Sequence, residues 1–240
     1  MFKIIRWLVW FFYPKIKVYG LENVPKENAV IVGNHTQLHG PIICELYAPE
    51  NCYTWCASEM MEFTKVPGYA FKDFWSQKPK YLHPFFKVLS YIITPLSVFI
   101  FNRAKTVPVY KNMKIMSTFK TSVKLLNEGK NLVIFPEHDV KYNNIVYDFQ
   151  ENFVDVAKLY FKKSGKKISF VPLYIAPKLK SMYFGKPVLF NPEADIKTEK
   201  VRICNYLKEE ITKIAVDLPR HTVVPYRNIP KKLYPTNKDF

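Results

Sequence analysis

The chain has 240 residues, of which 48% are hydrophobic and 16% are aromatic, so it carries enough apolar material for one sizeable core. Lysine and arginine total 36 against 20 aspartate and glutamate, and the net charge of +16 indicates an anionic partner. Because no RNA- or DNA-binding motif accompanies this charge and the lysines are scattered, nucleic acid is not the expected partner. The four cysteines fit no disulfide framework and are predicted to be reduced thiols of a cytoplasmic protein.

The N-terminal segment, residues 1–20, is predicted to be amphipathic. Its uncharged run, residues 7–13, is far shorter than the ~20 residues of a membrane-spanning helix. Tryptophan and phenylalanine flanked by lysine and arginine are typical of a helix that lies in the interface of an anionic membrane. We therefore expect a peripheral protein at the cytoplasmic face of the membrane. The alternative is a terminal helix that docks on the core.

The rest of the chain shows five apolar runs that predict buried strands and three segments with helical period. Gly129 and Gly165 are expected to end the first two helices, and Thr198 is expected to cap the third. The apolar stretch 85–101 is expected to be divided by Pro95 into a helix and a strand. The predicted strands are 29–33, 53–57, 97–101, 131–135 and 169–176, and the predicted helices are 111–128, 151–163 and 198–218.

From residue 97 to residue 176 the expected elements alternate as strand, helix, strand, helix, strand. This order predicts parallel βαβ units, and therefore an α/β fold with a mixed, largely parallel central sheet flanked by helices. The proline-rich, basic residues 219–240 are predicted to form an extended tail on the surface.

Polar residues follow two of the predicted strands. Asn34 and His35 come directly after the first strand, and 135–139 (FPEHD) ends another. In open α/β sheets, ligands bind beyond the carboxyl ends of the strands, so we expect these two groups to face one cleft. A histidine there is a candidate base, and a carboxylate nearby is its natural partner.

A metal site is the alternative interpretation of the same residues. His35 and His39 are four positions apart, a spacing that places two ligands on one face of a helix. Glu137, His138 and Asp139 could complete the shell of a metal-dependent hydrolase. Because Gly40 and Pro41 follow directly, a turn over 35–39 before a helix that starts at Pro41 is favoured, and no metal is expected.

Four blocks in this order resemble the glycerol-phosphate and lysophospholipid acyltransferase family. They are NHTQLHG (34–40), SVFIFNR (97–103), FPEH (135–138) and VPLY (171–174). The resemblance implies an acyltransferase-like domain over 21–218, between the membrane-interface segment and the tail. It also implies acyl transfer to the hydroxyl of a lysophospholipid-like or other lipid acceptor. The donor would be an acyl thioester, on CoA or an acyl carrier protein, which is a co-substrate rather than a cofactor.

The resemblance also implies roles for individual residues. His35 would be the general base that activates the acceptor hydroxyl. Arg103 would bind an anionic head group, because a guanidinium makes paired hydrogen bonds with such groups. Glu137 would hydrogen-bond acceptor hydroxyls or position the arginine. The other residues expected to contact substrate are Asn34, His39, His138 and Lys141.

The sequence departs from the family pattern at the partner of the base. Gly40 stands where the family has an aspartate, His138 replaces a glycine, and Val140 replaces an arginine, with Lys141 beside it. Loss of the orienting carboxylate is costly: in the serine protease triad it lowers turnover by ~10⁴-fold. Glu137 and Asp139 are the candidates to replace it, and His39 is a weaker one. Without a replacement, the site would belong to a degenerate lipid-binding protein.

Overall fold

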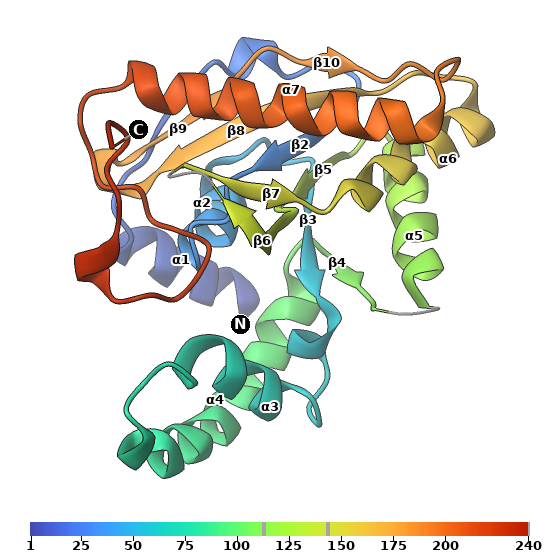
Figure 1. Ribbon diagram of the computed structural model, residues 1–240. Helices are drawn as coiled ribbons and strands as arrows, with labels where there is room; N and C mark the ends of the chain where they lie inside the picture. The colour runs from blue at the N-terminus through green and yellow to red at the C-terminus, as the bar shows by residue number, and fades with distance from the viewer. Residues whose placement is uncertain (112–113, 143–144, 240) are drawn as a thin grey trace.

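A mixed sheet forms the centre of the molecule (Figure 1). The computed structural model describes residues 1–111, 114–142 and 145–239, without the side chains of 139–142. Within these residues eight strands pair in the order β1–β9–β8–β2–β5–β3–β4, with β10 beside β8, and neighbours are parallel except where β8 meets β9 and β10. The predicted fold class, a mixed and largely parallel sheet flanked by helices, is confirmed. The strands are β1 Lys17–Tyr19, β2 Ala29–Gly33, β3 Cys52–Ala57, β4 Thr106–Val109, β5 Asn131–Ile134, β8 Ser169–Ala176, β9 Ser181–Phe184 and β10 Val188–Leu189.

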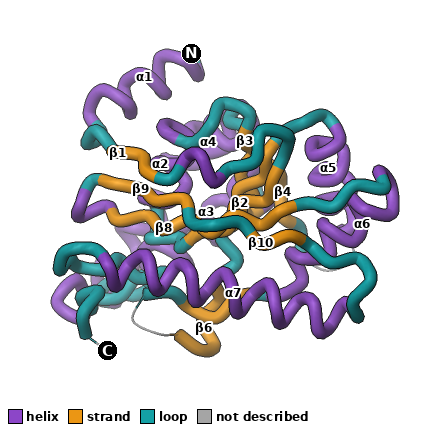
Figure 2. The backbone as a smooth tube through the Cα atoms, turned by 90° about the horizontal axis from the view of Figure 1, so that it is seen from above, coloured by secondary structure: helices purple, strands orange, loops and turns teal. Residues whose placement is uncertain are grey.

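Helices cover both faces of the sheet. Side chains alternate along β2, so Val30 and Val32 join the core under α5, α6 and α7, whereas Ala29 and Ile31 join the core on the α2 side. Figure 2 shows α7 lying along β8 and β10. This double cover explains why β2 reads as a continuous apolar run. The helices are α1 Phe2–Phe12, α2 His39–Tyr47, α3 Val66–Ala70, α4 His83–Arg103, α5 Ile115–Asn127, α6 Asp155–Ser164 and α7 Ile196–Asp217.

Four of the five predicted strands are present, and the fifth prediction is wrong. Residues 97–101 belong to α4, which continues through Pro95 to Arg103. The strand follows later, as β4. Pro108 lacks the N–H that a ladder needs, but β4 is the last strand of the sheet, where a proline is tolerated.

The predicted helix stops hold at two positions, and the predicted cap is wrong. Gly129 and Gly165 have φ of +73° and +70°, a conformation that glycine adopts without steric cost. The N-cap of α7 is Asp195 rather than Thr198. Its carboxylate accepts hydrogen bonds from the backbone N–H groups of Lys197 and Thr198, at 3.0 and 3.2 Å.

A helical arm projects from the sheet between β3 and β4 (Figure 1). It contains a 3₁₀ turn, Ser58–Met61, then α3, a π-helical turn, Phe71–Trp75, and α4. Among the described residues, one helical segment is long and apolar enough to cross a membrane, 80–103. Only 11% of the apolar 18-residue stretch within this segment is buried. The arm therefore holds a long apolar helix largely outside the core.

The C-terminal segment that follows α7 returns across the carboxyl end of the sheet. His221 is buried and its Nε2 lies 2.7 Å from the hydroxyl of Tyr174. Asn237 is fully buried, and its side-chain amide donates to the carbonyls of Ala215 and Leu218. These contacts fix both ends of a segment whose middle passes over the loop after β2.

Candidate functional site

Asn34 completes the pairing of β2 with β8 rather than facing a ligand. Its Oδ1 accepts the backbone N–H of Ile175 at 2.7 Å, and its Nδ2 donates to the Ile175 carbonyl at 3.0 Å. The side chain is 2% exposed and both of its polar groups are used. Asn34 therefore fixes the point at which the chain leaves the sheet, and so fixes the start of the next loop.

The loop 35–40 is an unusual turn. Thr36 and Gln37 are left-handed, with φ of +47° and +56°, a conformation that is rare for residues other than glycine and unusual for a β-branched one. The Gly40 N–H donates to the His35 carbonyl at 3.1 Å and closes the turn. Helix α2 begins at His39, two residues before the predicted start at Pro41. Backbone strain of this kind persists where surrounding contacts enforce it.

His35 lies between two aromatic rings. The centroid of its imidazole is 5.3 Å from that of Phe135 and 5.3 Å from that of Tyr226, both in edge-to-face geometry. Its Nδ1 is buried and makes no hydrogen bond within the described residues. Burial lowers the pKa of His35 to about 4, and the backbone of Gln37 opposes this shift. The imidazole is therefore neutral at physiological pH and has an unprotonated nitrogen, although burial makes it a weaker base than an exposed histidine.

Glu137 faces His35, as the order of the strands predicts, but binds its backbone. Glu137 begins β6 (Glu137–Tyr142), which pairs with β7 (Tyr147–Phe149). Oε1 accepts the N–H of His35 at 2.5 Å, and Oε2 accepts the N–H of Tyr147 at 2.8 Å. With both oxygens used, this carboxylate positions the loop and does not orient the imidazole.

Burial raises the pKa of Glu137 to about 7, although the two N–H donors oppose the shift. The pKa of a glutamate in the unfolded chain is near 4.5. The folded state therefore binds more protons between pH 4.5 and 7, and stability that is present below pH 4.5 is lost as the pH rises through 7.

Glu137→Gln is expected to remove this pH dependence. The free energy of unfolding of the wild type should fall by on the order of 3 kcal/mol between pH 5 and 8, relative to the variant. Urea unfolding over this range measures the difference. Glu209→Gln, a change of the same kind on the exposed face of α7, should keep the wild-type slope. Equal slopes for all three proteins would contradict the assigned titration.

His39, predicted to contact substrate or orient His35, binds the N-terminal segment instead. Its Nδ1 lies 2.6 Å from the hydroxyl of Tyr13, the residue that ends α1. Burial lowers the pKa of His39, with smaller effects in the same direction from Lys178 and Lys231. The chain before β1 is thereby linked to the start of α2.

The remaining residues of the third block are placed less fully. His138 is half-buried on β6, next to Glu137. The side chains of Asp139 and Lys141 lie outside the described residues, so their predicted roles stay predictions. Of the two candidates for the missing carboxylate, the described one is thus already committed to backbone N–H groups.

Arg103 does not follow a strand, so that expectation is wrong. It is an exposed residue in the last turn of α4, 5.8 Å from the ring of Phe99. The basic residue beyond the carboxyl end of β4 is Lys111, which pairs with Glu59 at 3.2 Å and lies 5.8 Å from the ring centroid of Tyr69. Placing the strand at 106–109 instead of 97–101 would have found it.

The C-terminal segment supplies residues to the site that no local sequence signal indicates. Tyr226 packs against His35, and its ring is also 5.8 Å from that of Tyr147. Gln37 donates to the carbonyl of Arg227 at 3.1 Å and to the hydroxyl of Tyr234 at 2.9 Å. The strained loop is therefore held by the N-terminal segment through His39 and by the C-terminal segment through Gln37.

The geometry does not support the helical argument for a metal pair. His35 lies in the turn and His39 begins α2, so the two do not share a helical face. Among the side chains that the structure describes, no group of three or more His, Cys, Asp and Glu residues could hold a metal ion.

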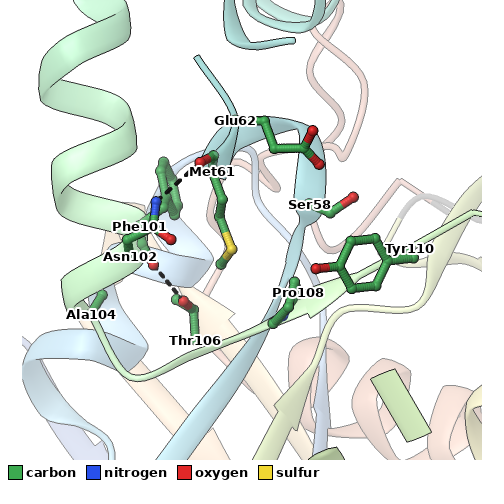
Figure 3. Close-up of a pocket in the computed structure, with 9 residues that line it drawn as sticks. All are labelled: Ser58, Met61, Glu62, Phe101, Asn102, Ala104, Thr106, Pro108 and Tyr110. Carbon is green, nitrogen blue, oxygen red and sulfur yellow. Dashed lines mark hydrogen bonds between the residues drawn. The ribbon is translucent and has the colours of Figure 1, made fainter. Parts of the chain in front are cut away.

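A cavity of about 270 Å³ lies at the root of the arm (Figure 3). Its walls are joined by hydrogen bonds from Asn102 to the carbonyl of Met61 at 3.1 Å and from Thr106 to the carbonyl of Phe101 at 2.7 Å. The lining includes neither His35 nor Glu137. These hydrogen bonds attach α4 to the 3₁₀ turn Ser58–Met61 and to β4.

The fold and the site together define an α/β enzyme with a neutral histidine beyond the carboxyl end of a central parallel strand. The chain belongs to the acyltransferase family: the family model described as Acyltransferase matches residues 15–176, more than half of the chain. The chain is therefore an acyltransferase, and the family resemblance drawn from the four blocks is confirmed. Among curated proteins, none matches it. A crystal structure of the 1-acyl-sn-glycerophosphate (LPA) acyltransferase PlsC from Thermotoga maritima is similar, with 15% identity and a TM-score of 0.46 over 87% of this chain and 78% of that chain.

Proposed function

We propose that this protein transfers a fatty acyl group from an acyl thioester, on CoA or an acyl carrier protein, to the hydroxyl of a lipid acceptor at a membrane surface. The observation that carries the proposal is the state of His35. It is a neutral imidazole held beyond the end of β2 by Asn34 and Glu137, in a chain of the acyltransferase family. A neutral imidazole at that place can act as a general base.

The reaction needs one proton to move twice. Nδ1 of His35 is closed off, so Nε2 would take the proton of the acceptor hydroxyl as its oxygen attacks the thioester carbonyl carbon. The tetrahedral intermediate then collapses, the carbon–sulfur bond breaks, and the thiolate receives the proton from the imidazolium. The products are an ester and a free thiol. Because burial disfavours the imidazolium, its lifetime would be short.

Lys111 would take the role that the family resemblance implies for Arg103. It follows the carboxyl end of β4, and its side chain is 76% exposed despite the contact with Glu59. An ammonium group is a suitable point charge for an anionic head group or for a donor phosphate.

The test is release of thiol from long-chain acyl-CoA with a panel of lysolipid and simple alcohol acceptors. Acceptor-dependent release by the folded wild-type protein would support the proposal. If acyl-CoA gives none, acyl-acyl carrier protein is the second donor to use. Absence of acyl transfer with both donors and every acceptor would contradict it.

Membrane association is part of the same proposal, and the packing of α4 supports it. This helix buries its small polar residues, Ser90, Thr94 and Ser97, against the arm. Its large apolar side chains are exposed instead, which is the reverse of a helix that packs on a soluble core. These exposed residues are Phe85, Val88, Tyr91, Ile92 and Leu96.

Helix α1 extends this apolar surface. It has no buried residue, it contacts α4, and it exposes Trp7, Phe11 and Phe12. The ammonium group of Lys15 lies over the ring of Trp10 just beyond the helix. Aromatic and aliphatic side chains next to lysines suit the interface of an anionic bilayer.

The variant Phe85→Ser/Ile92→Ser is expected to bind anionic vesicles roughly tenfold or more weakly than the wild type, because two exposed apolar side chains that would enter the bilayer interface are lost. Vesicle sedimentation measures this. Leu189→Ser/Val201→Ser removes exposed apolar side chains on β10 and α7 and should bind as the wild type does. Equal loss in both variants would place the membrane contact elsewhere.

A further inference from the structure

A second cavity, of about 390 Å³, opens at the β1 edge of the sheet. Figure 2 shows β1 and β9 side by side at this edge, with α1 leading into β1. Its size is within the range of small-molecule sites. The residues that matter in its lining are Lys15, Lys17, Lys180, Ser181, Tyr19 and Tyr183, and neither His35 nor Glu137 is among the lining residues.

The sheet brings the basic residues together from distant parts of the chain. Lys17 is paired with Ser181 in the parallel ladder of β1 and β9. The Lys17 N–H also donates to the carbonyl of Lys180 at 2.9 Å. Lys180 is left-handed, with φ of +52°, and ends the turn that precedes β9. The backbone positions of Lys17 and Lys180 are therefore fixed by the pairing of β1 with β9, whereas Lys15 lies in the connection between α1 and β1.

The three lysines lack carboxylate partners. In the described chain, none of them lies within 4.0 Å of an Asp or Glu oxygen. Ammonium groups that share one cavity repel each other, and an anion between them reverses the sign of that interaction. The cavity is thus electrostatically suited to an anion.

Ser181 adds an independent indication of a ligand. The residue is 2% exposed, and its Oγ makes no hydrogen bond within the described residues. A buried hydroxyl without a partner is costly, so native structures usually satisfy it. A phosphate oxygen in the cavity would accept from this hydroxyl and contact the lysines at the same time.

The other wall is aromatic. Tyr19 and Tyr183 stack with centroids 4.9 Å apart and planes 9° apart. The cavity is larger than a phosphate ion requires, and this flat wall would meet the organic part of the ligand. A phosphate ester fits the cavity better than a free inorganic ion does.

We propose that this cavity binds the phosphate group of a phosphate ester. The ester is either the head group of a membrane phospholipid or a soluble phosphorylated metabolite. Because α1 ends beside the cavity, with Lys15 over Trp10, the head group of a lipid in the bound membrane would have direct access. The inference does not depend on the acyl-transfer chemistry, and its test requires no turnover.

The first arm of the test is titration calorimetry at constant ionic strength with inorganic phosphate and glycerol 3-phosphate. Wild-type protein should bind both saturably, and glycerol 3-phosphate more tightly. Lys17→Gln/Lys180→Gln should abolish binding. Ser181→Ala should weaken it roughly tenfold, since one hydrogen bond to a charged group is lost, without lowering the unfolding midpoint of the free protein.

The matched control is Lys166→Gln/Lys167→Gln, which removes the same charge from an exposed loop and should bind as the wild type does. A second arm compares sedimentation with phosphatidylcholine vesicles that do or do not contain phosphatidic acid. Loss of the phosphatidic acid effect in the cavity variant identifies a lipid head group, and its retention identifies a soluble ester. Absence of phosphate binding by the wild type, or equal binding by the cavity and control variants, overturns the proposal.

Discussion

His35→Ala is expected to lower acyl transfer by roughly 10²–10⁴-fold, because the acceptor hydroxyl would lose the base that takes its proton. The variant should remain folded, since Nδ1 of His35 makes no hydrogen bond whose loss would leave a partner unsatisfied. Thiol release from acyl thioester in the presence of acceptor measures the effect. Binding of the donor should be retained, because the imidazole acts on the acceptor.

The pH profile of the wild type gives a second readout of the same assignment. A base must be unprotonated, and burial lowers the pKa of His35 from 6.5 to about 4. The kcat/KM profile for the acceptor should therefore show no inflection from His35 near pH 6.5, and protonation of this base should lower it only as the pH approaches 4. The free energy of unfolding also falls at low pH. Between pH 6.5 and 4 the unfolded chain binds a proton at this histidine that the folded state does not, so the stability present above pH 6.5 is lost as the pH falls.

His83 offers a matched control for the loss of an imidazole. It lies in the arm, where its Nε2 is 2.8 Å from the carbonyl of Lys78. His83→Ala should keep full acyl transfer. If His35→Ala also kept it, or if both variants lost it equally, His35 would not be the base.

The central strands and the position of the base were predictable because their signals are local. Residues 29–33 and 169–176 are short apolar runs, and the structure gives them the same bounds as β2 and β8. Parallel pairing then brings the end of β2 close to the segment after β5, so the contact of Glu137 with His35 follows from topology.

Residues 85–101 show where local signals fail. A continuous apolar run has no period, so a strand and a helix that is apolar on its exposed face look the same in the sequence. Pro95 predicts a boundary between two elements, yet α4 continues through it. The outward orientation of the apolar side chains depends on the packing of the arm, and a single sequence does not encode that orientation in its pattern.

The contacts of the C-terminal segment could not be predicted for a different reason. Gln37 and Arg227 are 190 positions apart and meet through a side-chain amide and a backbone carbonyl. No residue type in the tail is specific for such a contact. The sequence predicts the tail only as an extended surface segment, whereas Tyr226 in this segment packs against the imidazole of His35.

Gly40→Asp is expected to lower acyl transfer at least tenfold rather than improve it, although it restores the aspartate of the family pattern. A Cβ at position 40 would lie 2.3 Å from the carbonyl oxygen of His35, far inside van der Waals contact. That carbonyl accepts the Gly40 N–H, so the clash would open the turn that places the base. Thr36 and Gln37 would then lose one of the hydrogen bonds that enforce their left-handed backbone conformation.

Gly40→Ala separates shape from charge. If shape decides, both variants should lose acyl transfer to a similar extent, and each should lose about 1–3 kcal/mol of unfolding free energy. Gly68→Ala is the control, because a Cβ at that position in α3 meets nothing within 4 Å and should leave both quantities unchanged or raise stability slightly. Gain of acyl transfer in Gly40→Asp together with loss in Gly40→Ala would show instead that the loop can reform around a carboxylate–imidazole pair. Gly40 would then mark only the loss of the family's aspartate, and it would not be required by the turn that positions His35.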